Sequence, residues 1–342
     1  MGLVSVPITR RQFVAGTGAI GLGLLAGCGR WPGQGQAPVK LARVGLLLPY
    51  TADSRASLDV IEPFRAGLQD RGYVEGQNLL LEYRYSGGQN DRLPGLVTEL
   101  IQLPVDVIVA EKHDSILAAK QATSTIPIVM SVHADPVGAG LVTSLAHPGG
   151  NITGLTSLAT DLSAKRLELL QQASPAVSRV AMIYDHTYPS AQLMAADAKG
   201  GAEALGLELL DFDVRTPADF TPAFEAARRQ HADSLYTLSD PLSLRQQRRL
   251  LDFAAEQGLP AVYGEQSWVT SGGLMAYGPS YSAMYRRAAY YVDRILKGAK
   301  PADLPVEQPM TFEFVVNLKT ARELGITFPP EIMLQVTEVI DQ

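Results

Sequence analysis

The stretch Val105-Asp106-Val107-Ile108-Val109-Ala110 indicates the fold most clearly, because it is an almost continuous apolar run of strand length. Such runs are typical of parallel β-strands that helices cover on both faces. Apolar runs at residues 44–49, 78–85 and 127–132 alternate around it with amphipathic stretches at 54–71, 91–102 and 115–122. This alternation of strands and helices predicts a doubly wound α/β unit.

The alternation begins again after Asn151-Ile152-Thr153-Gly154. Helices are expected at 163–172, 190–205, 217–230, 244–257 and 285–296, and strands at 179–184, 208–214, 234–238, 261–263, 274–277 and 312–316. No tandem sequence repeat accompanies this second series. We therefore expect an α/β protein of two similar Rossmann-like lobes, with several crossings of the chain between them.

The composition excludes several classes of protein. The chain has 342 residues, of which 46% are hydrophobic and 19% charged, which is ordinary for a globular protein and excludes disordered and collagen-like classes. The formal net charge is −6, so no basic excess is present to bind nucleic acid. The single cysteine excludes an intramolecular disulfide.

The first 27 residues have the features of a bacterial export signal. Arg10 and Arg11 precede an uncharged run over 14–27, which is too short to span a membrane as a helix. The arginine pair resembles a twin-arginine signal, and Leu25-Ala26-Gly27-Cys28 resembles a lipobox. Cleavage there leaves 315 of the 342 residues, a lipid on Cys28 and a net charge of −8, with 27 basic against 35 acidic residues. An ordinary secretory signal with an incidental cysteine is the alternative.

Residues 28–39, rich in Gly, Gln and Pro, are expected to form a flexible tether. Within the signal, Gly16-Thr17-Gly18-Ala19-Ile20-Gly21 fits the dinucleotide-binding pattern G-x-G-x-x-G. It follows no predicted strand and begins no βαβ unit, so we reject a dinucleotide site.

Motifs of catalysis and metal binding are missing from the sequence. It contains no G-x-S-x-G, no H-E-x-x-H and no P-loop, so nothing in it calls for an enzyme or a cofactor. The five histidines lack the spacing of metal ligands. His113 and His133 are placed to approach each other across adjacent strand ends, which leaves a metal there as a minor alternative.

Polar residues gather directly after the predicted strands, where open parallel sheets bind ligands. The candidate ligand-binding residues are Tyr50, Thr51, Asp53, Lys112, His113, Ser115, Asp135, Asp185, Tyr188, Asp240, Gln266 and Trp268. Helix N-termini at these loops favour an anion, aspartates favour an ammonium group, and aromatic rings suit a flat ligand. The structural alternative is that Asp135-Pro136 and Asp240-Pro241 form turns, and that Ser and Asp cap helices.

Several motifs resemble bacterial ABC-transporter substrate-binding proteins of the tryptophan/tyrosine type. The most distinctive are GLQDRGYVEGQN at 67–78, AAKQATSTIPIV at 118–129, PGGNITG at 148–154, KRLELL at 165–170 and FEFVVNLKTA at 312–321. Together with shorter matches, they extend over essentially the whole mature chain.

This resemblance implies a type I periplasmic-binding-protein fold, with two lobes, three crossings and a ligand trapped between the lobes by hinge closure. The crossings are expected near 154–157, 278–280 and 314–317. Lobe 1 is then 40–155, completed by about 281–313, and lobe 2 is 156–280, completed by about 317–342.

The resemblance also implies a function. We expect a monomeric solute-binding protein of an importer, taking an aromatic amino acid or related compound, with its permease and ATPase on separate chains. It is expected to be exported as a periplasmic or cell-surface lipoprotein, anchored to the membrane through Cys28. A clamshell sensor that docks a membrane receptor kinase and an exported α/β hydrolase remain alternatives.

One loop departs from the family pattern. After the third strand the family usually carries small residues, whereas this chain has Glu111-Lys112-His113-Asp114-Ser115. A bulky, charged loop there is expected to alter the size and charge of the pocket. Lys112 is left with two kinds of partner: an acidic group of the ligand, or Asp53 or Asp135 in a structural salt bridge.

Overall fold

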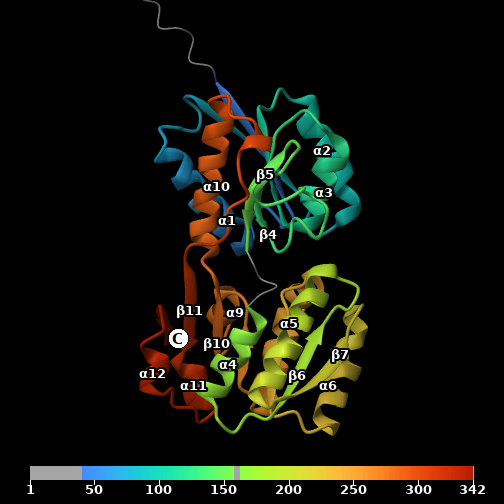
Figure 1. Cartoon of the computed structure of the whole chain (residues 1–342), viewed down its shortest axis with the longest axis vertical. Coiled ribbons are helices and arrows are strands. Elements are labelled where there is room, and N and C mark those ends of the chain that lie inside the picture. Colours follow the sequence, from blue (N-terminus) through green and yellow to red (C-terminus); the bar gives the residue numbers. More distant parts are fainter. Residues whose placement is uncertain (1–40, 158–161, 342) are drawn as a thin grey trace, which may run out of the picture. The chain divides into compact units, whose positions relative to one another are not determined.

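The computed structural model describes residues 41–157 and 162–341, and its long strands form two sheets (Figure 1). The first sheet has the order β2-β1-β3-β4-β5, and all of its neighbouring strands are parallel. Its strands are β1 (Ala42–Leu48), β2 (Leu79–Tyr85), β3 (Val107–Glu111), β4 (Ile128–His133) and β5 (Ile152–Thr156). The expected export signal, Cys28 and the tether lie outside the described residues.

The second sheet has the order β12-β11-β10-β9-β8-β6-β7. Its strands are β6 (Arg179–Tyr184), β7 (Glu208–Asp213), β8 (Ser234–Thr237), β9 (Ala261–Tyr263), β10 (Met275–Pro279), β11 (Phe312–Asn317) and β12 (Glu338–Ile340). β10 and β11 are antiparallel, whereas the other paired neighbours are parallel. The sequence did not predict this reversal or the three-residue strand β12.

Helices cover both faces of each sheet, as parallel strands require. In the first lobe they are α1 (Arg55–Gln69), α2 (Leu93–Gln102), α3 (Lys112–Ala122) and α10 (Tyr281–Leu296). In the second they are α4 (Ser163–Ala173), α5 (Pro189–Leu205), α6 (Phe220–Arg229), α7 (Pro241–Arg245), α8 (Gln247–Gln257), α9 (Gln266–Thr270), α11 (Leu318–Glu323) and α12 (Pro330–Met333). Short 3₁₀ turns at Asn90–Arg92, Pro217–Asp219 and Pro301–Asp303 complete the described elements. None of the described helices is long and apolar enough to cross a membrane.

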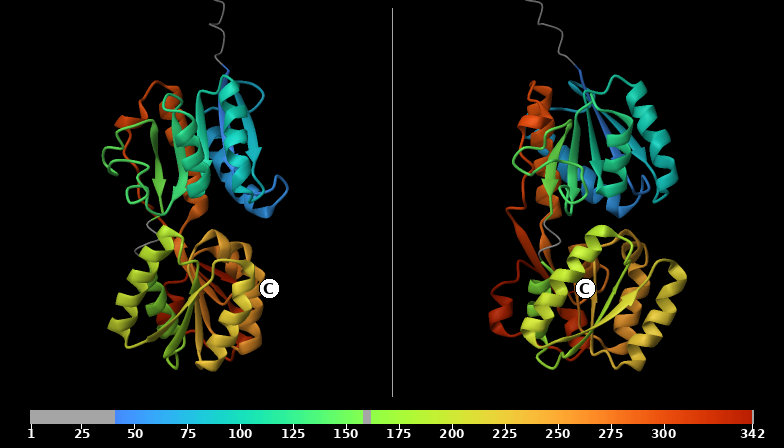
Figure 2. Two further views of the ribbon diagram at one scale, coloured as in Figure 1. Left: turned by 90° about the vertical axis from the view of Figure 1, so that its right-hand side faces the viewer. Right: turned by 45° about the vertical axis from the view of Figure 1, so that its right-hand side comes forward.

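Helix α10 belongs to the first lobe although it follows a strand of the second. It lies beside α1 on one face of the first sheet, whereas α2 and α3 lie on the other face (Figures 1 and 2). Gly67 allows the two helices to approach closely, since a Cβ there would lie 2.3 Å from the carbonyl oxygen of Arg286. Helix α10 begins at Tyr281, four residues earlier than the sequence predicted, after the N-cap Ser280.

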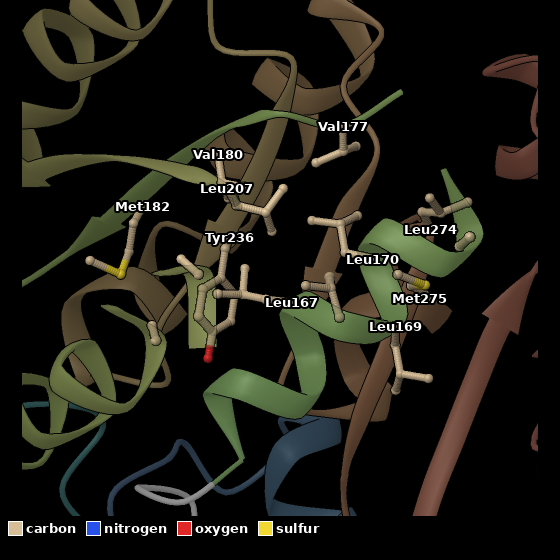
Figure 3. Packing of buried hydrophobic residues seen from close by; sticks show 14 of the residues in the cluster. Leu167, Leu169, Leu170, Val177, Val180, Met182, Leu207, Tyr236, Leu274 and Met275 are labelled. Carbon is tan, nitrogen blue, oxygen red and sulfur yellow. The ribbon is translucent and has the colours of Figure 1, made fainter. Parts of the chain in front are cut away.

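The second sheet has its own core on each face. Leu167 and Leu170 of α4 pack with Met182 and Tyr236 of the sheet on one face (Figure 3). Phe220 and Phe253, from helices α6 and α8, belong to the cluster on the other face. Each sheet is therefore buried on both faces by its own helices, as the apolar strands of the sequence required.

The chain changes sheets three times. It leaves the first sheet after β5, returns to it between β10 and α10, and leaves again between Glu307, which is bridged to Leu155, and β11. The second crossing lies where the sequence placed it. The third precedes Phe312, so the expected position near 314–317 is wrong: that segment lies within β11 and pairs with β10.

Candidate ligand-binding site

A cluster of charged and aromatic side chains lies where elements of both lobes end. We call Tyr50, Glu111, Lys112, Glu265, Tyr281 and Tyr285 the Lys112 cluster. Lys112 Nζ lies 3.9 Å from Glu111 Oε1, 3.8 Å from Glu265 Oε1 and 5.2 Å from the centroid of the Tyr281 ring. Glu265 follows β9 of the second sheet, whereas Lys112 follows β3 of the first. The pair of Lys112 and Glu265 therefore joins the two lobes.

Glu111 is the fully buried carboxyl group of this cluster. Its Oε1 accepts hydrogen bonds from Tyr285 Oη at 2.9 Å and Tyr50 Oη at 3.4 Å, and its Oε2 accepts one from Ser131 Oγ. Burial raises the pKa of Glu111, while the Lys112 charge and the hydroxyl donors oppose that shift. Its carboxyl group is thus held by hydroxyl groups of the first lobe.

The acidic groups around Lys112 determine its pKa. Burial alone lowers the pKa of Lys112, but Glu265 and the other acidic groups more than offset it, so that the pKa lies well above its ordinary value. Burial also raises the pKa of Tyr281 and of Tyr188 to about 12, and the charge of Lys112 opposes the shift in both. Lys112 is therefore a permanent cation among neutral tyrosines.

The sequence correctly predicted that His113 and His133 approach each other, since His113 Nδ1 lies 3.0 Å from His133 Nε2. The backbone N–H of Asp135 donates to His133 Nδ1 at 3.1 Å, which requires the proton of a neutral His133 to be on Nε2. His133 therefore donates to His113 Nδ1. Burial, followed by the charges of His113 and Lys112, lowers the pKa of His133 from 6.5 to about 3. Among the described residues no group of three His, Cys, Asp or Glu side chains could hold a metal ion.

Arg166 of α4 is a second cation at this site and, unlike Lys112, is fully buried. Its Nε donates to the carbonyl oxygen of Tyr277 at 2.7 Å, and its Nη1 donates to Tyr236 Oη at 3.3 Å. No carboxylate of the described residues lies within ion-pair distance of its guanidinium. The charge of Arg166 acts on Tyr281, which also faces Lys112. Cations of both lobes thus act on the same tyrosine.

Three of the four predicted aspartates make local hydrogen bonds instead. Asp135 Oδ1 accepts from the backbone N–H of Gly138 at 2.8 Å, and Asp185 Oδ1 accepts from that of Thr187 at 2.8 Å. Asp240 is buried and caps α7 by accepting from the N–H and hydroxyl of Ser243. These are the contacts of turn-forming and capping residues.

The remaining candidates are dispersed. Thr51 and Asp53 are exposed, and Ser115 is buried with a hydroxyl group that finds no hydrogen-bond partner among the described residues. Gln266 donates to Glu338 of β12 at 2.8 Å. Trp268 is stacked on Tyr263 in the core that also contains Phe220 and Phe253. Of the predicted residues, Tyr50 and Lys112 belong to the Lys112 cluster, and Tyr188 is close enough for the charge of Lys112 to act on its pKa.

Sequence reasoning missed Glu265, Tyr281, Tyr285 and Arg166 as site residues. Tyr281 and Tyr285 are four residues apart and hence on one face of α10, but the helix was predicted to begin only at Tyr285. Glu265 adjoined the predicted Gln266, and nothing in its neighbourhood distinguished it. Arg166 lay in an apolar helix face, where an arginine without an acidic partner is unusual.

Comparisons with known proteins agree with this architecture. The family model described as ABC transporter substrate binding protein matches residues 50–340. A tyrosine-binding protein from Clostridioides difficile (strain R20291) is 26% identical over 319 residues, covering 90% of each chain. The crystal structure of a conserved domain protein from Vibrio cholerae has a TM-score of 0.80 at 28% identity and covers 88% of this chain and 100% of its own. An ABC domain in complex with L-Trp from Streptococcus pneumonia has a TM-score of 0.80 at 24% identity, covering 87% of this chain and 99% of its own.

The chain therefore belongs to the family of ABC transporter substrate binding proteins. The α/β fold of two lobes that the sequence predicted is confirmed, and so is the resemblance to this family.

Proposed function

We propose that the protein captures an aromatic amino acid or a related small organic compound between its lobes by hinge closure, as the extracytoplasmic binding protein of an ABC importer. The observation that carries this proposal is the Lys112 cluster, in which charged and aromatic groups of both lobes meet at the carboxyl ends of their strands. The tyrosine-binding relative and the L-Trp complex support the choice of ligand class.

The proposal also covers the partners, the oligomeric state and the location of the protein. The protein is a monomer that passes its ligand to a permease, whose ATPase is on a separate chain, and it catalyses no reaction. It is exported and held at the membrane by lipid on Cys28. Mass spectrometry of the chain from membranes tests the anchor: the wild type carries a lipid on Cys28, and Cys28→Ser does not. An unmodified wild-type cysteine contradicts the anchor.

Ligand capture is tested by thermal unfolding of the full-length chain in detergent. We expect L-tyrosine, L-tryptophan or a related aromatic solute to raise the melting temperature, with a gain of about 2.7 kcal/mol at a ligand concentration one hundred times Kd. Ribose serves as the control solute. If no amino acid or aromatic acid raises the melting temperature, and native mass spectrometry finds no ligand in the purified protein, the proposal is wrong.

A further inference from the structure

The ammonium group of Lys112 makes no hydrogen bond to any described residue. Its two neighbouring carboxylate oxygens lie at 3.8 and 3.9 Å, which is ion-pair distance but beyond a hydrogen bond. The side chain is 28% exposed and hence partly buried. An ammonium group has three N–H donors, and a partly buried donor that forms no hydrogen bond is unfavourable. Lys112 is therefore open to an acceptor from outside the chain.

The backbone at Lys112 is in the left-handed region, with φ +65°, directly after an irregularity in the pairing of β3 with β4. A lysine in this conformation is strained by about 1–2 kcal/mol, which a glycine would avoid. Strain of this kind persists where the surrounding structure maintains it, and it gathers at sites that bind ligands. The lysine in this conformation lies 3.8 Å from Glu265 of the other lobe.

The two carboxylates beside Lys112 differ in their hydrogen bonding. Glu111 is satisfied by three hydroxyl donors. The Glu265 carboxylate is only 16% exposed and accepts no hydrogen bond from a described residue. A cation with open donors and an anion with open acceptors thus lie 3.8 Å apart. The chemical complement of such a pair is a small molecule with both an anionic and a cationic group on neighbouring atoms.

We infer that Lys112 and Glu265 select a zwitterionic α-amino acid, with Lys112 Nζ donating to the ligand's α-carboxylate and Glu265 accepting from its α-ammonium. The inference rests on the proposed function and specifies the ligand's charged groups. The rings of Tyr50, Tyr188 and Tyr281, which all lie within the electrostatic influence of Lys112, provide the aromatic surroundings for its side chain.

Three matched probes separate the two charges of the ligand. L-tyrosine has both, 3-(4-hydroxyphenyl)propionate lacks the ammonium group, and tyramine lacks the carboxylate. Calorimetric titration of the full-length chain should show L-tyrosine binding most tightly. Lys112→Met should weaken L-tyrosine and the propionate by about 10- to 100-fold, as loss of a charged hydrogen bond does, and leave tyramine unchanged or tighter. Glu265→Gln should weaken L-tyrosine and tyramine while sparing the propionate.

Matched controls are Lys199→Met and Glu208→Gln, which remove exposed charges paired with Asp211 and Arg179. Both should bind all three probes as the wild type does, and the melting temperature without ligand shows that each variant folds. Because Glu265→Gln is isosteric, it tests the inference even if Lys112→Met unfolds.

Any one of four results would overturn the inference, and the first three concern the pattern of affinities. They are equal weakening of all three probes by either variant, an unchanged affinity of Lys112→Met for L-tyrosine, and wild-type affinity for tyramine or the propionate equal to that for L-tyrosine. Failure of the wild type to bind any of the three also overturns it. In that case the melting-temperature screen with other solutes shows separately whether the proposed ligand-binding function survives.

Discussion

The buried His133, which is paired with His113, makes the stability of the protein depend on pH in a way that one substitution isolates. His133 is 3% exposed, and its Nδ1 accepts the backbone N–H of Asp135. A proton on Nδ1 removes this acceptor and places a charge in the core, beside Lys112 and His113. Native His133 therefore remains neutral at a pH where the unfolded chain binds a proton.

The sign and size of the effect follow from the two pKa values. The native pKa of about 3 lies below the ordinary value of 6.5, so the stabilising contribution is present above pH 6.5 and is lost as the pH falls toward 3. Between pH 7 and pH 4.5 the free energy of unfolding should fall by about 2.5 kcal/mol on account of His133 alone, or about 1.4 kcal/mol for each pH unit below 6.

Urea unfolding of the wild type and His133→Asn at several pH values measures this effect. The Asn side-chain oxygen can replace Nδ1 as the acceptor of the Asp135 N–H, but Asn does not titrate. The stability difference between the two proteins should therefore shift by about 2.5 kcal/mol in favour of the variant from pH 7 to pH 4.5. The exposed His147→Asn serves as the control. If the curves of wild type and His133→Asn are parallel over this range, the assignment of a neutral buried His133 is wrong.

Three other substitutions test local features of the fold. Asp240→Ala should lower the free energy of unfolding by about 1–2 kcal/mol, because α7 loses its N-cap, and urea unfolding measures it. Gly154→Ala should cost at least about 2 kcal/mol, since φ is +133° and a Cβ would lie 2.2 Å from the carbonyl oxygen of Met130; a loss below 1 kcal/mol would contradict this geometry. Trp268→Ala should lower the free energy of unfolding by about 3–5 kcal/mol through loss of its packing on Tyr263, and should leave the ligand affinity of the folded protein unchanged. Weakened binding without loss of stability would show that Trp268 contacts the ligand.

The fold was largely predictable because its buried strands are apolar over their whole length. Residues 179–184 and 261–263 were predicted with the bounds that the structure gives them. The strand β12 was not predicted, because its residues Glu338 and Val339 are exposed and carry no pattern of burial. The antiparallel β11 could not be distinguished from a parallel strand, since strand direction depends on where the chain crosses between lobes and leaves no periodicity of its own.

The candidate site was less predictable, because it depends on which residues of distant segments meet. The sequence placed Lys112 after a strand and offered it either an acidic group of the ligand or a salt bridge with Asp53 or Asp135. Its acidic neighbours within the chain are instead Glu111 and Glu265. The contact between His113 and His133 was predictable, since His133 ends β4 and His113 comes two residues after the adjacent parallel strand β3. The sequence allowed the predicted aspartates to be either helix caps or ligand contacts. Only their hydrogen bonds in the structure distinguish these two roles.

The antiparallel pairing of β10 and β11 has a mechanical consequence for the hinge that we propose. The two connections that adjoin these strands are tied together where they leave the sheet, because the N–H of Ser280 donates to the carbonyl oxygen of Thr311 at 2.9 Å. Two of the three connections must therefore bend as one ribbon, while the third, after β5, bends separately. A two-stranded ribbon bends easily out of its own plane but resists sliding of one strand along the other. Such a hinge therefore favours opening of the lobes along a single path over their free rotation.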